Sequence, residues 1–273
     1  MDLKNKRSQT LAFCLGILLT GALVQLAGSL RGDRLVFPGV GQILSVFVRL
    51  LGEGSTWLRI GVTLLHLAEA LALSALLGLL VGLAEGFSPF VRSLLKPLMI
   101  TLRSLPMIIL VILIMVLAHY SMVPLIATTL VLVPLLSESV CEGLLAIEPE
   151  LLDVYRMNSS LTPRVLWNVH LPLMAGYLKQ SWINAVGMGL KVAVTTEYLV
   201  QSRNSLGKAV YSSLFNSEYA EIYAWALIMI LLILTLTGVP AVIIRGLSDR
   251  NQQTRAAARS SLKKSHWLFF RAL

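Results

Sequence analysis

Long apolar runs separated by short polar segments make up most of the chain. An α-helix of about 20 apolar residues crosses a ~30 Å hydrocarbon core, because each residue adds about 1.5 Å. By this measure about six membrane spans are expected, at roughly 11–30, 58–83, 96–117, 123–145, 172–200 and 219–244. The pattern therefore predicts an all-α, polytopic membrane protein whose transmembrane domain covers residues 1–246 and is followed by a basic tail at 247–273.

Two shorter segments between the expected spans also have helical character. Apolar residues recur at helical spacing over 40–51, which predicts an amphipathic helix at the outer membrane surface that ends at Gly52 and Gly54. The polar segment 201–218 is expected to be an outer loop with some helix.

Small residues recur every four positions in the second expected span, at Ala70, Ser74, Gly78, Gly82 and Gly86. Such a stripe allows helices to approach closely in lipid, so this face is expected to pack against another helix. Interior prolines bend helices, so Pro106 is expected to kink the third span and Pro134 to interrupt the fourth.

Basic residues are concentrated in alternate polar segments. The chain is 56% hydrophobic with a formal net charge of +9, and one soluble core of this length could not bury so much apolar surface. Lysine and arginine precede the first span, follow the second, occur in the insert after the fourth and fill the tail. By the positive-inside rule these segments are cytoplasmic, although Arg31, Arg34, Arg49 and Arg59 make the first outer segment an imperfect case. The charge thus indicates membrane orientation and not nucleic-acid binding.

The fifth expected span carries a polar stripe that consists of Gln180, Asn184, Lys191 and Thr195. Their spacings of four, seven and four residues place them within a narrow arc of a helix. A lysine this deep in a span needs water, a solute or a partner opposite it, so this face is expected to line a translocation pathway. Arg103, near the start of the third span, is a second cationic candidate. A salt bridge from Lys191 to Glu69 or Glu138 is the structural alternative.

Three further ionisable residues lie within expected spans: His66 and Glu69 in the second, and Glu197 at the end of the fifth. Ionisable groups inside a bilayer are costly, which makes them candidate site residues. Glu197 is included among the pathway candidates, although it is offset from Lys191 by roughly a third of a turn. Local hydrogen bonding is the alternative for all three.

Motifs of enzymes and metal sites are absent from the sequence. Gly187-Met188-Gly189 lacks the third glycine and the strand of a dinucleotide loop, and no Gly-x-x-x-x-Gly-Lys phosphate loop occurs. The four histidines have no metal-ligand spacing. Cys14 and Cys141 lie in separate apolar runs, where cysteine acts as a small buried hydrophobe. No catalytic residue, metal site or cofactor is therefore expected in this chain, and it is not expected to hydrolyse ATP itself.

The longest polar insert, residues 146–172, separates the fourth and fifth spans. Proline favours the first turn of a helix, so Pro149 and Pro163 predict two short helices joined by a turn at Asn158-Ser159-Ser160. Leu171-Pro172 is expected to close the second helix. An insert this short has too little apolar surface to form a domain, which indicates that another protein docks on it.

The insert resembles the cytoplasmic signature loop of bacterial ABC importer permeases, whose pattern is Glu-Ala-Ala, three residues, Gly, nine residues, Ile, any residue and Leu-Pro. In this chain Asp153, Val154 and Tyr155 take the Glu-Ala-Ala positions, Ser159 that of Gly, Val169 that of Ile, and Leu171-Pro172 the last two. The resemblance implies that the loop couples the permease to a separate ATPase through Asp153, Val154, Tyr155, Arg156, Ser159, Leu171 and Pro172.

Three other features resemble one branch of that family, the permeases for nitrate, sulfonates, taurine and related small solutes. They are Phe37-Pro38, the stretch Leu102-Arg103-Ser104-Leu105-Pro106, and Glu197. The resemblance extends from about Val36 to about Arg245. It implies a small solute, either an anion such as nitrate or a sulfonate, or a small heterocycle.

The resemblance also implies partners and a location. A permease of this kind works in the bacterial cytoplasmic (inner) membrane, as a homodimer here, with an external solute-binding protein and two ATPase subunits that hold ATP and magnesium. A self-sufficient secondary transporter or channel is the alternative from another class, but it would not need a docking loop, and no inverted repeat is evident. A membrane scaffold without transport is a third alternative, which the polar stripe disfavours.

Overall fold

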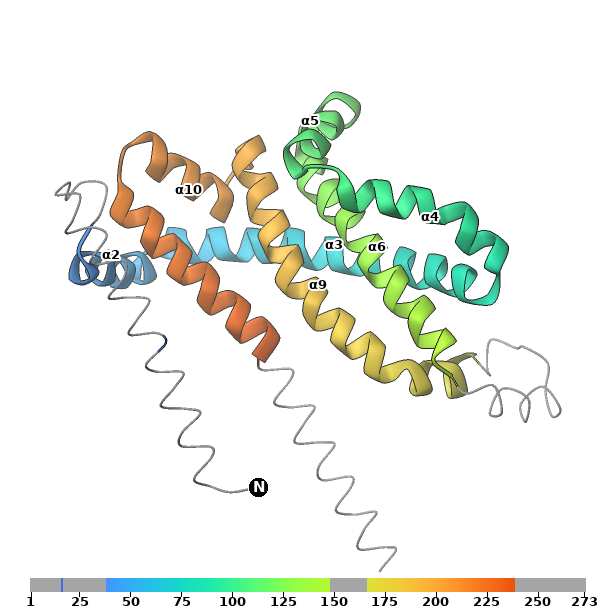
Figure 1. Cartoon of the computed structure of the whole chain (residues 1–273). Coiled ribbons are helices and arrows are strands. Elements are labelled where there is room, and N and C mark those ends of the chain that lie inside the picture. The colour runs from blue at the N-terminus through green and yellow to red at the C-terminus, as the bar shows by residue number, and fades with distance from the viewer. Residues whose placement is uncertain (1–15, 17–37, 148–165, 239–273) are drawn as a thin grey trace, which may run out of the picture. The chain divides into compact units, whose positions relative to one another are not determined.

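This computed structural model describes residue 16 and residues 38–147 and 166–238, drawn as ribbons in Figure 1. The expected first span, most of the polar insert and the basic tail lie outside these residues. Over the described ranges every regular element is a helix and no strand occurs. The all-α prediction is therefore confirmed for the part of the chain that the structure describes.

The first two described helices follow each other almost without a break. α2 (Val40–Gly52) agrees with the helix expected at 40–51. It ends because Glu53 adopts an extended backbone. Gly54 then begins α3 (Gly54–Phe87), a helix of 34 residues that extends beyond both expected ends of the second span. The prediction that Gly54 would help to end α2 is therefore wrong.

α3 packs closely against α6 (Val123–Leu145) through its small residues. A Cβ added at Gly78 would lie 2.7 Å from Leu136 Cβ, and one added at Gly82 would lie 2.5 Å from the Ser137 carbonyl oxygen. A larger residue would therefore collide with the neighbouring helix. The small-residue stripe is a packing face, as predicted, and its partner belongs to the same chain.

The third expected span is two helices and not one kinked helix. α4 (Pro89–Ser104) begins before Lys96, with its first turn capped by Ser88, and α5 (Met107–Leu117) follows after a break. The two helices are bent by 105°. Pro106 causes the break, because it cannot donate a backbone hydrogen bond and disfavours a helical conformation at the preceding residue. That residue, Leu105, has an extended backbone with ψ of 127°.

α6 begins and ends where the fourth span was expected, at Val123 and Leu145, directly after a single 3-10 turn (Tyr120–Met122). Pro134 lies inside α6 but does not interrupt it, so that prediction is wrong. A buried proline is tolerated in a membrane helix when neighbouring helices support it. α6 has such neighbours, because it runs between α3 and α9 (Figure 1).

The polar insert ends in a short π-helix (Leu166–His170) that continues into α9 (Leu171–Val200). Leu171-Pro172 was expected to close a helix, but these residues open one. Proline fits there because the first turn of a helix has no intrahelical use for its missing N–H. α10 (Leu206–Phe215) lies within the expected outer loop, and the last described helix covers Tyr219–Gly238.

Three of these helices are long and apolar enough to cross a membrane: α3, Tyr120–Leu145 and Tyr219–Gly238. The bent pair α4–α5 makes four if it is taken as one span. α9 is equally long at 30 residues but includes Lys179, Lys191 and Glu197. The polytopic prediction is therefore confirmed, whereas six spans stay a prediction. The chain divides into two compact units, 1–230 and 231–273, and the site described below belongs to the first.

Candidate functional site

Polar side chains form one exposed face of α9. The stripe residues Gln180, Asn184, Lys191 and Thr195 are all exposed in this chain, in agreement with their helical spacing. The Gln180 amide donates to Asn184 Oδ1 at 3.2 Å, and the Thr195 hydroxyl donates to the Lys191 carbonyl at 2.8 Å. Both bonds stay within α9, so no other described element pairs with these side chains.

A cavity of about 500 Å³ lies beside this face, between α9 and residues of α4, α5 and α6. Its polar lining residues are Arg103, Lys191 and Thr195, and the others are apolar. No carboxylate lines it, and Lys191 forms no ion pair with any residue that the structure describes. Two pathway cations predicted from separate spans therefore share one cavity. The alternative salt bridges of Lys191, to Glu69 or Glu138, are not formed between these described residues.

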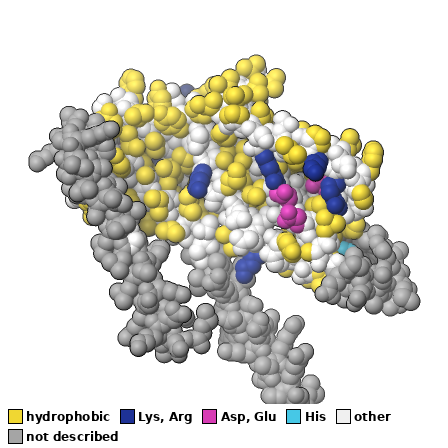
Figure 2. Space-filling view, viewed as in Figure 1, with side chains coloured by type: hydrophobic (Ala, Val, Ile, Leu, Met, Phe, Trp, Pro, Cys, Tyr) yellow, Lys and Arg dark blue, Asp and Glu magenta, His cyan; other side chains and the backbone are white. Residues whose placement is uncertain are grey.

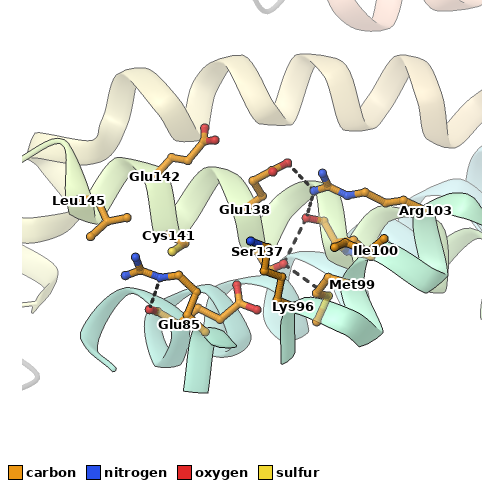
Figure 3. A pocket seen from close by; sticks show the side chains of 12 residues that line it. Glu85, Lys96, Met99, Ile100, Arg103, Ser137, Glu138, Cys141, Glu142 and Leu145 are labelled. Atoms are coloured by element: carbon orange, nitrogen blue, oxygen red, sulfur yellow. Dashed lines mark hydrogen bonds and ion pairs between the residues drawn. The ribbon is translucent and has the colours of Figure 1, made fainter. Parts of the chain in front are cut away.

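Arg103 reaches from the end of α4 to α6. Its Nη2 donates to the Pro134 carbonyl at 2.6 Å and pairs with Glu138 Oε2 at 2.5 Å (Figure 3). Because both partners are on α6, these contacts hold the C-terminal end of α4 against that helix. The two side chains are 40% and 49% exposed, so solvent screens the ion pair, which contributes less than about 1 kcal/mol by itself.

Glu197, the remaining pathway candidate on α9, does not line the cavity beside the polar stripe. Its side chain is fully buried. Its Oε2 accepts from the Thr63 hydroxyl at 2.8 Å and from the Gly207 N–H at 3.2 Å, and its Oε1 lies 2.8 Å from His66 Nδ1. A buried carboxylate requires such partners, because leaving it unpaired is costly. Glu197 therefore joins α3, α9 and α10, and His66 belongs to the same group of contacts.

Two of these contacts were not predicted from the sequence. A sequence pattern could have indicated the pairing of Arg103 with Glu138, because Arg92, Lys96 and Arg103 are spaced by four and seven residues and give α4 a basic face. No sequence pattern indicated the contact of Gly207 with Glu197. A Cβ there would lie 2.5 Å from Glu197 Cβ, so the requirement for glycine arises from contact with another helix.

Charged side chains gather on one part of the surface. In Figure 2 most of the visible basic and acidic side chains form one group over α4 and α6, and much of the surrounding surface is hydrophobic. The charge on this face of the molecule is therefore concentrated over α4 and α6 rather than spread evenly.

Most of the expected coupling residues, namely Asp153, Val154, Tyr155, Arg156 and Ser159, lie outside the described residues. Leu171 and Pro172 form the first turn of α9, directly after the π-helix. The described end of the polar insert therefore leads straight into the helix that carries the polar stripe.

Comparisons with known proteins bear on this arrangement. Residues 74–254 match the family described as "Binding-protein-dependent transport system inner membrane component". A chain of the MetNI methionine ABC transporter, solved in inward-facing conformations, is similar in fold, with a TM-score of 0.59 and 16% sequence identity over 71% of this chain and 98% of that chain. No curated protein gives a significant match. Because the family match covers more than half of the sequence, the chain belongs to the family of inner membrane components of binding-protein-dependent transport systems.

Proposed function

We propose that this chain is the permease subunit of an ABC importer and that the polar stripe of α9 lines its translocation route. Lys191 is the observation that carries the proposal: it is exposed, unpaired among the described residues, and shares a cavity with Arg103 and no carboxylate. A charged group within a bilayer is tolerated only against water or a partner. The exposed polar stripe of α9 is therefore suited to line a water-filled translocation route.

The charge of the cavity favours an anionic solute. Lys191 and Arg103 line it together. Among the described residues Arg103 is paired with Glu138, whereas Lys191 forms no ion pair. A fixed cation in a low-dielectric route raises the local population of anions, provided that binding stays weak enough for release. Nitrate or a sulfonate fits this chemistry, as the branch resemblance suggests, and a small heterocycle is the other class considered.

The complete transporter in this proposal contains several chains. Two permease copies face each other across their α9 stripes in the bacterial cytoplasmic membrane, and a solute-binding protein delivers the solute from outside. Two ATPase subunits hold ATP and magnesium on the inside. The family membership supports such partners, because its members are described as components of binding-protein-dependent systems.

Substitution of Lys191 tests the route. Lys191→Met and Lys191→Glu should each abolish uptake of the anion into proteoliposomes while the ATPase remains bound, and the glutamate variant should be at least as impaired. Lys179→Met is the matched control, because Lys179 is on the same helix but does not line the cavity. Normal uptake by Lys191→Met, or loss of assembly alone, would mean that the stripe is structural.

The coupling loop requires a separate test. Tyr155→Asp should release the ATPase or let it hydrolyse ATP without transport, because the new charge would lie in the surface proposed to dock on it. Co-purification of the ATPase and the ratio of ATP hydrolysed to solute transported are the measurements. Unchanged assembly and uptake would contradict the assignment of 146–172 as the coupling element.

A further inference from the structure

A second cavity lies between α3, α4 and α6 (Figure 3). Its volume is about 290 Å³, close to the lower end of the roughly 300–1,000 Å³ range of small-molecule sites. Arg103 lines this cavity as well as the one that contains Lys191. Arg103 therefore borders both cavities.

Glu85 is the unusual residue of this second cavity. It is 6% exposed, and its side chain points into the cavity (Figure 3). Its backbone carbonyl accepts a bond from Arg92 Nε at 3.1 Å. Its carboxylate is attracted by Arg92 and Arg103 at longer range but forms no hydrogen bond or close ion pair with any described residue. A buried carboxylate without a directly bonded partner is unfavourable, so this position favours a ligand that brings a cationic group.

The other charges of the cavity determine which kind of cation fits. The described residues contain no group of His, Cys, Asp and Glu able to hold a metal ion, which favours an organic cation over a metal ion. Arg103 and Glu138 neutralise each other. Glu85 and Glu142 are then the remaining acidic residues that line the cavity, and Arg92 and Lys96 are the remaining basic ones. Groups of both signs are thus available to one ligand.

We propose that this cavity binds a small zwitterion, with its ammonium group at Glu85 and Glu142 and its acidic group at Arg92 and Lys96. Arg103 lines both this site and the Lys191 cavity, so the two cavities are neighbours. This inference rests on the proposed function only where it identifies the ligand with the transported solute. The existence of the site is independent of transport.

Cys141 provides a built-in reporter, because its thiol lines the same cavity. In the purified full chain with Cys14→Ala, the rate at which N-ethylmaleimide modifies Cys141 is measured in the presence of three matched probes at equal concentration. They are β-alanine, propionate, which lacks the ammonium group, and propylammonium, which lacks the acid. β-Alanine should slow modification several-fold more than either of the other two probes. Only β-alanine carries both an ammonium group for the glutamates and an acidic group for the basic residues.

Two variants test the role of Glu85 in this protection. Glu85→Gln should remove the advantage of β-alanine over propionate, whereas Glu69→Gln, an exposed carboxylate on the same helix outside the cavity, should leave it unchanged. Glu85→Asp keeps the charge and should retain part of the advantage, which separates loss of charge from misfolding. Equal effects of the three probes, including no effect of any, overturn the proposal, as does an advantage that survives Glu85→Gln. Normal uptake by Lys191→Met would refute the proposed translocation route but would leave this zwitterion site untouched.

Discussion

Removal of the Glu197 carboxylate should strongly destabilise the contacts among α3, α9 and α10. Glu197 accepts from Thr63 and Gly207 and pairs with His66, and it is fully buried. Hydrogen bonds to charged groups contribute about 1.5–3 kcal/mol each, and breaking a buried ion pair costs about 3–5 kcal/mol. The three donors lose the same acceptor together, so these values overlap and are not summed. Glu197→Ala should therefore lower the free energy of unfolding by about 3–5 kcal/mol.

The measurement is reversible unfolding of the purified chain in detergent micelles, followed by circular dichroism of the helices. Glu69→Ala is the control, because Glu69 is exposed on α3 and forms no ion pair with the described residues; it should change stability by less than about 0.5 kcal/mol. Glu197→Gln preserves the shape and one acceptor and should fall between the two. A loss below about 1 kcal/mol in Glu197→Ala would refute the reasoning that the network stabilises the fold.

Two other perturbations follow from the structure. Gly82→Ala places a Cβ 2.5 Å from a backbone oxygen of α6 and 2.6 Å from Val140 Cβ. It should therefore lower the free energy of unfolding by about 1–3 kcal/mol in the same assay. Gly61→Ala is the control and should cause no measurable change, because nothing lies within 4 Å of the added Cβ. The nearby Glu221 carboxylate raises the pKa of Glu218 above its ordinary value of 4.5. The folded chain therefore binds the Glu218 proton more tightly than the unfolded chain does. As a result, the contribution of Glu218 to stability falls as the pH rises above 4.5. Glu218→Gln should therefore give a small stabilisation at pH 7 that disappears below pH 4, and a pH-independent effect would contradict this.

The sequence alone determined most of the helical segments, because their length and boundaries depend on residues near each other in the chain. α6 agrees with its expected span at both ends, and α9 begins one residue before the expected start. The same holds for the polar stripe, since helical spacing places Gln180, Asn184, Lys191 and Thr195 on one face. The small-residue stripe of α3 also identified a packing face, although not its partner.

Only the tertiary structure decided which residues meet across helices. The sequence predicted a kink at Pro106, but only the structure shows that the break there separates two helices bent by 105°, both in contact with α6. In the sequence Glu197 is only one of several ionisable residues in an apolar chain. The structure shows that α3 and α10 supply hydrogen-bond donors to it. Arg103 and Lys191 are 88 residues apart in sequence and share a cavity because α4 and α9 both border it. Local periodicity assigns a residue to a face of its helix, whereas burial, pairing and cavities arise between faces of different helices.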